Sequence, residues 1–321
     1  MEKLVAHKHW FFAFIFSFVF VYLFHWTDMI GREFWDIGNY MSRIAYLARD
    51  GNEASLSILQ WMFEEPLWKS MVIFIGNVVD AAHYRSALYF ISFMALFLYG
   101  SFFFRRIEYY IIIVLFFNPL MVNLFIEQIR SALAFSLLLV AYDLSSRRAT
   151  IFIIITAFLI HASMLIFVLI YFMLKKLNSV VEARKYYLVI LGISILMAFF
   201  MRYGLDFILQ IMGNRHAGYN EYAKGSSLAF STFWFLLALV LSIFSNFENE
   251  EERLTIAYSI LILNFFFFTS IFGGFAQRYV SLSFPIVIIA ISYLPKHFKQ
   301  VTYMALFAYS LLMFRYWFYV S

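Results

Sequence analysis

Long apolar stretches recur from one end of the chain to the other, with short polar loops between them. An α-helix of about 20 apolar residues crosses the hydrocarbon core of a bilayer, which is about 30 Å thick. The pattern therefore predicts an all-α, polytopic integral membrane protein with roughly 10–12 transmembrane or re-entrant helices. We expect these helices at residues 10–26, 67–82, 86–104, 109–126, 129–144, 149–174, 186–202, 228–246, 254–272, 279–294 and 300–319.

Three of these stretches are irregular. Residues 129–144 are short for a full crossing, residues 149–174 are long with His161 at their middle, and Asn118–Pro119 interrupts residues 109–126. Irregular backbone survives within a membrane only where it lies beside protein or water. We therefore expect a functional site near these segments.

Basic pairs in short loops predict the orientation, because cytoplasmic loops carry an excess of Lys and Arg. The pairs are Arg105–Arg106, Arg147–Arg148, Lys175–Lys176 and Arg184–Lys185. Placing all four inside requires residues 149–174 to form a re-entrant pair of half-helices with His161 at the outer turn. Residues 67–82 would then also re-enter. We expect one transmembrane domain, residues 1–321, with extracytoplasmic loops at 27–66 and 203–227.

Residues 33–50 are too polar to span a membrane, but their apolar residues recur at helical spacing, which predicts a helix in the membrane interface. These apolar residues are Phe34, Ile37, Met41, Ile44 and Ala48. Asp36, Tyr40 and Arg43 fall on a different stripe, which we expect to face along the membrane surface.

The composition agrees with a membrane protein and excludes several functions. Of the 321 residues, 64% are hydrophobic and only 13% are charged, whereas soluble proteins average about 25% charged residues. The net charge of +5 lies mainly in the short loops, so no nucleic-acid partner is expected. The absence of cysteine excludes disulfides, thiolate chemistry and Cys-ligated metals.

Two arginines lie where apolar helices are expected to start. Arg130 follows Glu127 and Gln128, and Arg278 with Tyr279 follows Gly273–Gly274. A helix N-terminus carries partial positive charge, so an arginine there favours binding of an anion such as phosphate. Alternatively, Arg130 forms an ion pair with Glu127, and Arg278 is an anchor at the membrane interface.

A proton acceptor is the other requirement of most transfer reactions. His161 is the natural candidate for a general base, and Asp36 is the alternative. His161 could instead be a packing residue, and Asp36 could simply face water. The spacing of His and acidic residues predicts no metal site. Glu65 precedes Pro66, so a purely structural role as a helix cap is one interpretation of this residue. The loop at 202–225 contains Arg215 and several tyrosines that suit sugar binding.

An ordered set of short motifs resembles the EpsG family, the Wzy-type polymerases of bacterial exopolysaccharide and O-antigen. The motifs are Asp36-x3-Tyr40, Glu65-Pro66-Leu67-Trp68, Ile129-Arg130 through Ala132 and Ala134, Ile160-His161-Ala162-Ser163, and Arg278-Tyr279. They extend over nearly the whole chain. Two departures are Ser131, where such proteins often have Gln after the Arg, and Ala162, where Pro is frequent after the His.

The resemblance implies a metal-independent glycosyltransferase with a GT-C-like architecture in the bacterial cytoplasmic membrane. It would transfer a growing glycan from polyprenyl pyrophosphate to a lipid-linked repeat unit at the outer face, without a cofactor. The catalytic residues would be His161 or Asp36 together with Arg130. Substrate would be bound by Arg130, Arg278, Tyr279, Arg215, Tyr40 and Glu65. Membrane lipid and a chain-length regulator are the further partners expected.

Two other functions fit the same residues. A membrane O-acyltransferase that decorates a glycan would also use a deep His and an Arg. A transporter of lipid-linked sugar would bind pyrophosphate with the arginines, while His161 would only pack. The sequence shows no internal repeat, and this disfavours a transporter because many transporter folds are built from repeats.

Overall fold

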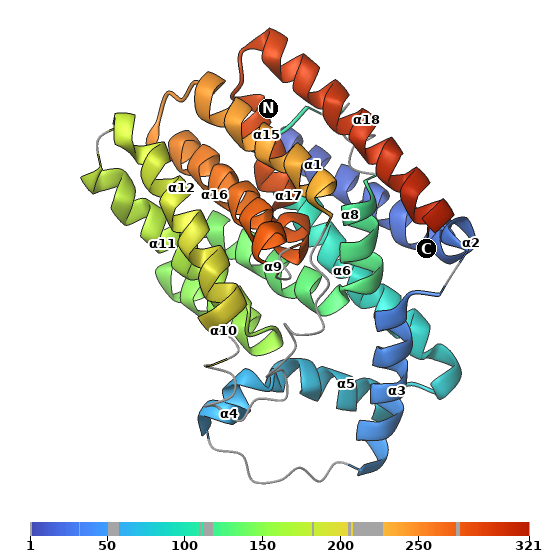
Figure 1. The fold of residues 1–321 in the computed structure, drawn as a ribbon. Coiled ribbons are helices and arrows are strands. Elements are labelled where there is room, and N and C mark those ends of the chain that lie inside the picture. Colours follow the sequence, from blue (N-terminus) through green and yellow to red (C-terminus); the bar gives the residue numbers. More distant parts are fainter. Residues whose placement is uncertain are drawn as a thin grey trace. The chain divides into compact units, whose positions relative to one another are not determined.

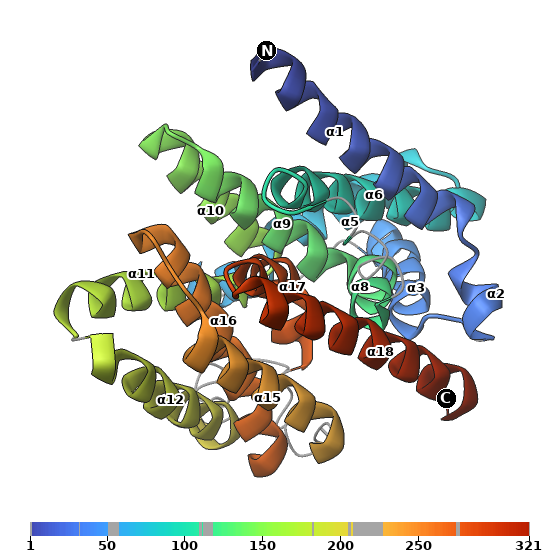
Figure 2. The same cartoon turned by 90° about the horizontal axis from the view of Figure 1, so that it is seen from above.

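The computed structural model describes residues 2–31, 33–50, 58–108, 111, 118–181, 183–204, 207, 227–273 and 277–320. Within these ranges nearly every residue is helical and no strand occurs, as Figures 1 and 2 show. The predicted all-α class is therefore confirmed. The chain forms two compact units, one of Met1–Leu165 with Phe307–Ser321 and one of Ile166–Leu306.

The first unit contains most of the N-terminal helices. Their bounds are α1 (Glu2–Phe18, continued by a π-helical segment Val19–Leu23), α2 (Trp26–Ile30), α3 (Trp35–Asp50), α4 (Ile58–Phe63), α5 (Pro66–Val78), a 3-10 turn (Ala81–His83), α6 (Tyr84–Phe103), α8 (Pro119–Val122, continued by a π-helical segment Asn123–Glu127), α9 (Ile129–Asp143) and α10 (Arg147–Ile160).

Helix α6 lies at the centre of this unit, with α1 and α9 packed against it and α10 packed against α9. Leu88, Ala95 and Leu96 of α6 are completely buried. Helix α5 packs against both α3 and α10, which brings its first residues to the end of α10. With only 13 residues, α5 is about 20 Å long and too short to cross a bilayer.

A helix begins directly after Asn118, where the sequence predicts an interruption. The side chain of Asn118 accepts a hydrogen bond from the backbone N–H of Leu120 at 2.9 Å, and Pro119 opens α8. The segment Pro119–Glu127 then meets α9 at an angle of 102°. Two separate segments, rather than one continuous helix, therefore precede Asp143.

The long apolar stretch around His161 is also broken, as predicted. Helix α10 ends at Ile160, His161 has an extended backbone (φ −151°, ψ 107°), and α11 begins at Met164. Ser146 caps the start of α10 by accepting a hydrogen bond from the Ala149 N–H at 3.5 Å. The chain contains no Pro or Gly at this break, so its cause lies in tertiary contacts.

The helix predicted within residues 33–50 is present as α3, and its location in the membrane interface stays a prediction, but the prediction for one of its faces was wrong. Ile37, Tyr40, Ile44 and Leu47 form its buried stripe. Tyr40 is only 9% exposed, so it does not face along the membrane surface as expected. The ring of Tyr40 packs inward against Trp68 of α5, and the centres of the two rings are 5.3 Å apart.

The second unit contains α12 (Ala183–Phe199, continued by a π-helical segment Phe200–Gly204), α15 (Leu228–Phe244), α16 (Glu250–Phe272), α17 (Gln277–Ser292), most of α11 (Met164–Val180) and the first part of α18 (Lys296–Val320). Helix α16 is its centre and packs against α12, α15 and α17. At its start the side chain of Asn249 accepts a hydrogen bond from the Glu252 N–H and donates one to the Glu252 carboxylate, and Gly273, with φ 81°, ends the helix.

Three helical segments in the described ranges are long and apolar enough to cross a membrane: Ala81–Phe103, Tyr186–Gly204 and Glu250–Phe272. The bent pair Pro119–Glu127 and Ile129–Asp143 would make a fourth, and shorter apolar helices occur at Lys8–Leu23, Leu228–Phe244 and Gln277–Ser292. The chain is thus a multi-pass membrane protein. The total of roughly 10–12 transmembrane or re-entrant helices stays a prediction.

Candidate functional site

Glu65 occupies the residue before α5, and its backbone there is unusual. With φ 58° and ψ 58° it adopts the left-handed conformation, and among the described residues other than glycine it alone has a positive φ. Pro66 follows, and a proline normally holds the preceding residue in an extended conformation. Such strain, of the order of 1–3 kcal/mol, persists where surrounding contacts enforce it and is concentrated at functional sites.

The carboxylate of Glu65 joins two residues that are distant in sequence. Nη1 of Arg130, at the start of α9, donates to Oε2, and Nδ1 of His161, directly after α10, lies 2.5 Å from Oε1. The three side chains are only 10–15% exposed. The first unit therefore brings together Glu65, Arg130 and His161, which we call the acidic–basic cluster.

The contacts of Arg130 and Glu65 differ from the simplest ones that the sequence allowed. Arg130 pairs with Glu65, whereas Glu127 accepts a hydrogen bond from Asn123 at 2.5 Å. The side chain of Glu65 makes no capping hydrogen bond to α5. Glu65 and His161 are therefore each hydrogen-bonded to a partner that is distant in the sequence.

The cluster fixes the orientation of the imidazole of His161. An ionised carboxylate can only accept a hydrogen bond, so the contact with Glu65 requires a proton on Nδ1. In a neutral ring Nε2 is then the nitrogen that carries the lone pair. A carboxylate that holds the far nitrogen of a histidine in this way is the arrangement by which hydrolases position a general base.

The surroundings of Arg130 favour a negatively charged ligand. The N-termini of α5 and α9 both lie at the cluster, and each carries partial positive charge. Several buried donors of the described residues have no hydrogen-bond partner, and two of them, Nε of Arg130 and Nε1 of Trp68, lie in the first turns of α9 and α5. Buried donors are nearly always paired, so these two call for an acceptor such as a phosphate oxygen.

Aromatic contacts hold the start of α5 in place. The rings of Tyr40 and Trp68 pack edge to face between α3 and α5. Phe63 at the end of α4 and Phe158 near the end of α10 are likewise edge to face, with 5.7 Å between ring centres. Asp36, one turn before Tyr40, is half-buried in the first turn of α3.

The remaining predicted residues lie elsewhere in the chain. Arg278 and Tyr279 are in the first turn of α17, as expected, and belong to the second unit. Tyr279 is only 9% exposed and packs against Phe167 and Phe265, with ring centres 5.5 and 5.4 Å away. Arg215 lies outside the described residues. Within those residues no three His, Asp or Glu side chains gather as a metal ion would require.

Comparison with known proteins decides the family. The EpsG family model matches residues 8–321, nearly the whole chain. The chain belongs to the EpsG family. This family consists of Wzy-type polysaccharide polymerases, which use lipid-linked oligosaccharides as substrates. No curated protein and no solved structure matches the chain. The resemblance seen in the sequence motifs is thus confirmed, and three of those EpsG motifs supply the three members of the acidic–basic cluster.

Proposed function

We propose that this EpsG protein is a polysaccharide polymerase whose catalytic centre is the acidic–basic cluster. It transfers a growing glycan from polyprenyl pyrophosphate to a lipid-linked repeat unit at the outer face of a bacterial cytoplasmic membrane. The observation that carries the proposal is the carboxylate of Glu65, which holds a guanidinium and an imidazole together from three separate helix ends. The guanidinium of Arg130 can bind an anionic leaving group, and the imidazole of His161 can accept a proton from a hydroxyl.

In the reaction, a hydroxyl oxygen of the acceptor sugar attacks the anomeric carbon of the donor glycan. Its proton passes to Nε2 of His161, and the bond between the anomeric carbon and the pyrophosphate oxygen breaks. Polyprenyl pyrophosphate leaves with the bonding electrons. Arg130 and the N-terminus of α9 stabilise the charge that develops on it, so the protein's own donors serve without a metal ion.

Glu65 is a positioning residue in this scheme. It holds the ring of His161 in the tautomer whose lone pair is on Nε2, and it stabilises the imidazolium that forms when the proton is accepted. The structure supports His161 over Asp36 as the base because His161 contacts both a carboxylate and, through it, Arg130.

The other residues have supporting roles that rest on the family resemblance. Arg278 and Arg215 would add cationic contacts to pyrophosphate. Tyr279 and Tyr40 would shape the glycan-binding surface, with Tyr40 acting through its packing on Trp68. A chain-length regulator would be the protein partner.

Analysis of lipid-linked intermediates tests this function. In a strain lacking the native gene, Arg130→Ala or His161→Ala should leave single repeat units on the lipid and abolish long polymer. Matched controls are Arg148→Ala and His83→Ala, which change exposed residues of the same types. All variants must be present in the membrane at equal levels. Long polymer of normal length from either cluster variant would refute the assignment, and full-length polymer lacking acyl groups would indicate an acyltransferase.

A further inference from the structure

Helices α9 and α10 form a hairpin that is too short to cross a bilayer. They pack against each other, are joined by residues 144–146, and have 15 and 14 residues. At 1.5 Å per residue each is about 22 Å long, whereas the hydrocarbon core is about 30 Å thick. One end of the hairpin must therefore lie inside the membrane if the other end reaches its surface.

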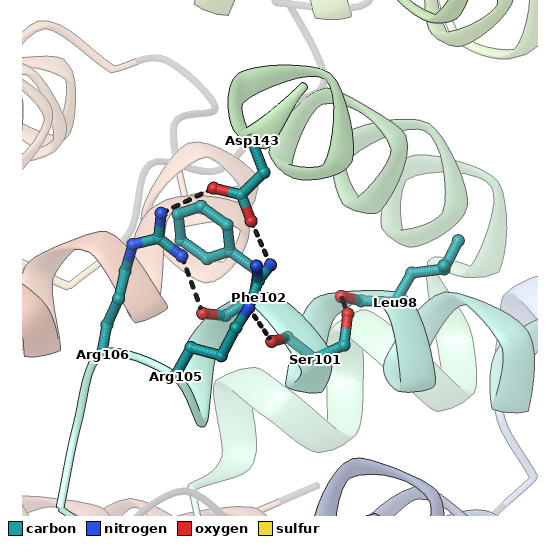
Figure 3. Close-up of polar contacts among 6 residues, drawn as sticks. All are labelled: Leu98, Ser101, Phe102, Arg105, Arg106 and Asp143. Atoms are coloured by element: carbon teal, nitrogen blue, oxygen red, sulfur yellow. Dashed lines mark hydrogen bonds and ion pairs between the residues drawn. The ribbon is translucent and has the colours of Figure 1, made fainter. Parts of the chain in front are cut away.

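The linked end of the hairpin is rich in arginine. Asp143, the last residue of α9, accepts from Nη2 of Arg105 and, at 2.6 Å, from Nη2 of Arg106 (Figure 3). The same arginines donate to the carbonyl oxygens of Ser101 and Phe102 at 2.9 and 3.1 Å. We call Arg105, Arg106 and Asp143 the arginine clamp. Arg147 and Arg148 begin α10 a few residues after Asp143. Four arginines at one end mark it as the cytoplasmic surface.

The open end of the hairpin contains Arg130 and His161. Contacts with α6 show at which point along α6 this end lies. Ser92 of α6 donates a hydrogen bond to the carbonyl of Phe125, just before the bend into α9. The rings of Tyr99 and Phe125 lie 4.9 Å apart, which also places this bend beside the middle of α6. Ser92 is eight residues from Tyr84, the start of α6, so the bend lies about 12 Å from that end.

We infer that the acidic–basic cluster is recessed within the membrane, roughly 10 Å below the outer edge of its hydrocarbon core. The depth follows from the short hairpin, its arginine clamp at the cytoplasmic surface and the register with α6. It does not depend on the proposed function. If the protein is a polymerase, the pyrophosphate of its lipid-linked substrate must descend below the level of the surrounding lipid phosphates. Arg130 and the helix N-termini offset the cost of that descent.

Spin-label depth measurements test this inference, and the cysteine-free chain allows single labels to be placed cleanly. Leu165→Cys reports the level of the cluster, since Leu165 is 40% exposed and lies four residues after His161, in the first turn of α11. Ala82→Cys, beside the start of α6, and Ser145→Cys, beside the arginine clamp, are exposed reference positions. Collision with oxygen and with a water-soluble nickel complex gives the depth of each nitroxide in lipid vesicles.

The label at Leu165 should lie about 10 Å deeper than the labels at Ala82 and Ser145. A membrane-impermeant thiol reagent added to intact cells stripped of their wall should modify Ala82→Cys but reach Ser145→Cys only after permeabilisation. Equal depths at Leu165 and Ala82, or modification of Ser145→Cys from outside, would overturn the inference. Both readouts are independent of catalysis, so a failure of the proposed polymerase function would leave them unchanged.

Discussion

Replacing Glu65 by Gln removes one negative charge from the cluster while preserving the shape of the side chain. Its two partners are held by the two oxygens of one carboxylate, and all three side chains are at most 15% exposed. Removing one partner of such a buried ion pair costs about 3–5 kcal/mol, because the opposite charge is left uncompensated. We expect Glu65→Gln to lower the free energy of unfolding by about 3 kcal/mol, since Gln still offers a hydrogen bond to each partner.

The effect of the same change on catalysis should be larger than on folding. An amide can donate to Nδ1 of His161 and so stabilise the wrong tautomer, which places the proton on Nε2. General-base catalysis contributes about a hundred- to ten-thousand-fold, and turnover should fall within that range. Turnover is measured as polymer formed per protein in vesicles, below the melting temperature of the variant, and stability is measured by thermal unfolding in detergent.

Glu64→Gln is the matched control, because it removes a neighbouring carboxylate that follows α4 and lies outside the cluster. The control should retain turnover and stability close to those of the native protein. If Glu65→Gln also kept its turnover within about threefold of the native value, Glu65 would not position the base and the proposed chemistry would be refuted.

Three further predictions address the backbone, the arginine clamp and the base. Glu65→Gly should be more stable than Glu65→Ala by up to about 1 kcal/mol in thermal unfolding, because glycine adopts the left-handed conformation without strain; equal or lower stability would contradict this. Asp143→Asn should lower stability by about 1 kcal/mol, because Arg105 and Arg106 are partly solvated, yet leave turnover unchanged, since the cluster lies about 20 Å away along α9. His161→Gln should lose polymer formation while Asp36→Asn retains it; the opposite result would assign the base to Asp36.

Local features of the site could be predicted from the sequence because they depend on nearby residues. The start of α9 at Ile129 follows a bent apolar segment, and the polar atoms of Arg130 and His161 are costly in hydrocarbon. Asn118–Pro119 carries its own capping chemistry, so the start of α8 there was also predictable. In each case a few consecutive residues contain the signal.

The role of Glu65 could not be predicted in the same way. Its partners are 65 and 96 residues away in the sequence, and no local pattern connects them. The break at His161 likewise lacks Pro or Gly, so it depends on the packing of α5 against α10. Tyr40 was assigned to the wrong face of α3 because a tyrosine suits both an interface and a core, and its partner Trp68 lies on another helix.

We propose that the acidic–basic cluster transfers glycan from a lipid pyrophosphate. The most direct test of this proposal measures the polyprenyl pyrophosphate released by purified protein in vesicles supplied with lipid-linked repeat units. We expect one released polyprenyl pyrophosphate for each new glycosidic bond in the native protein, and neither product in folded Arg130→Ala or His161→Ala. Chain growth without release of polyprenyl pyrophosphate, or growth at the native rate in either variant, would contradict it.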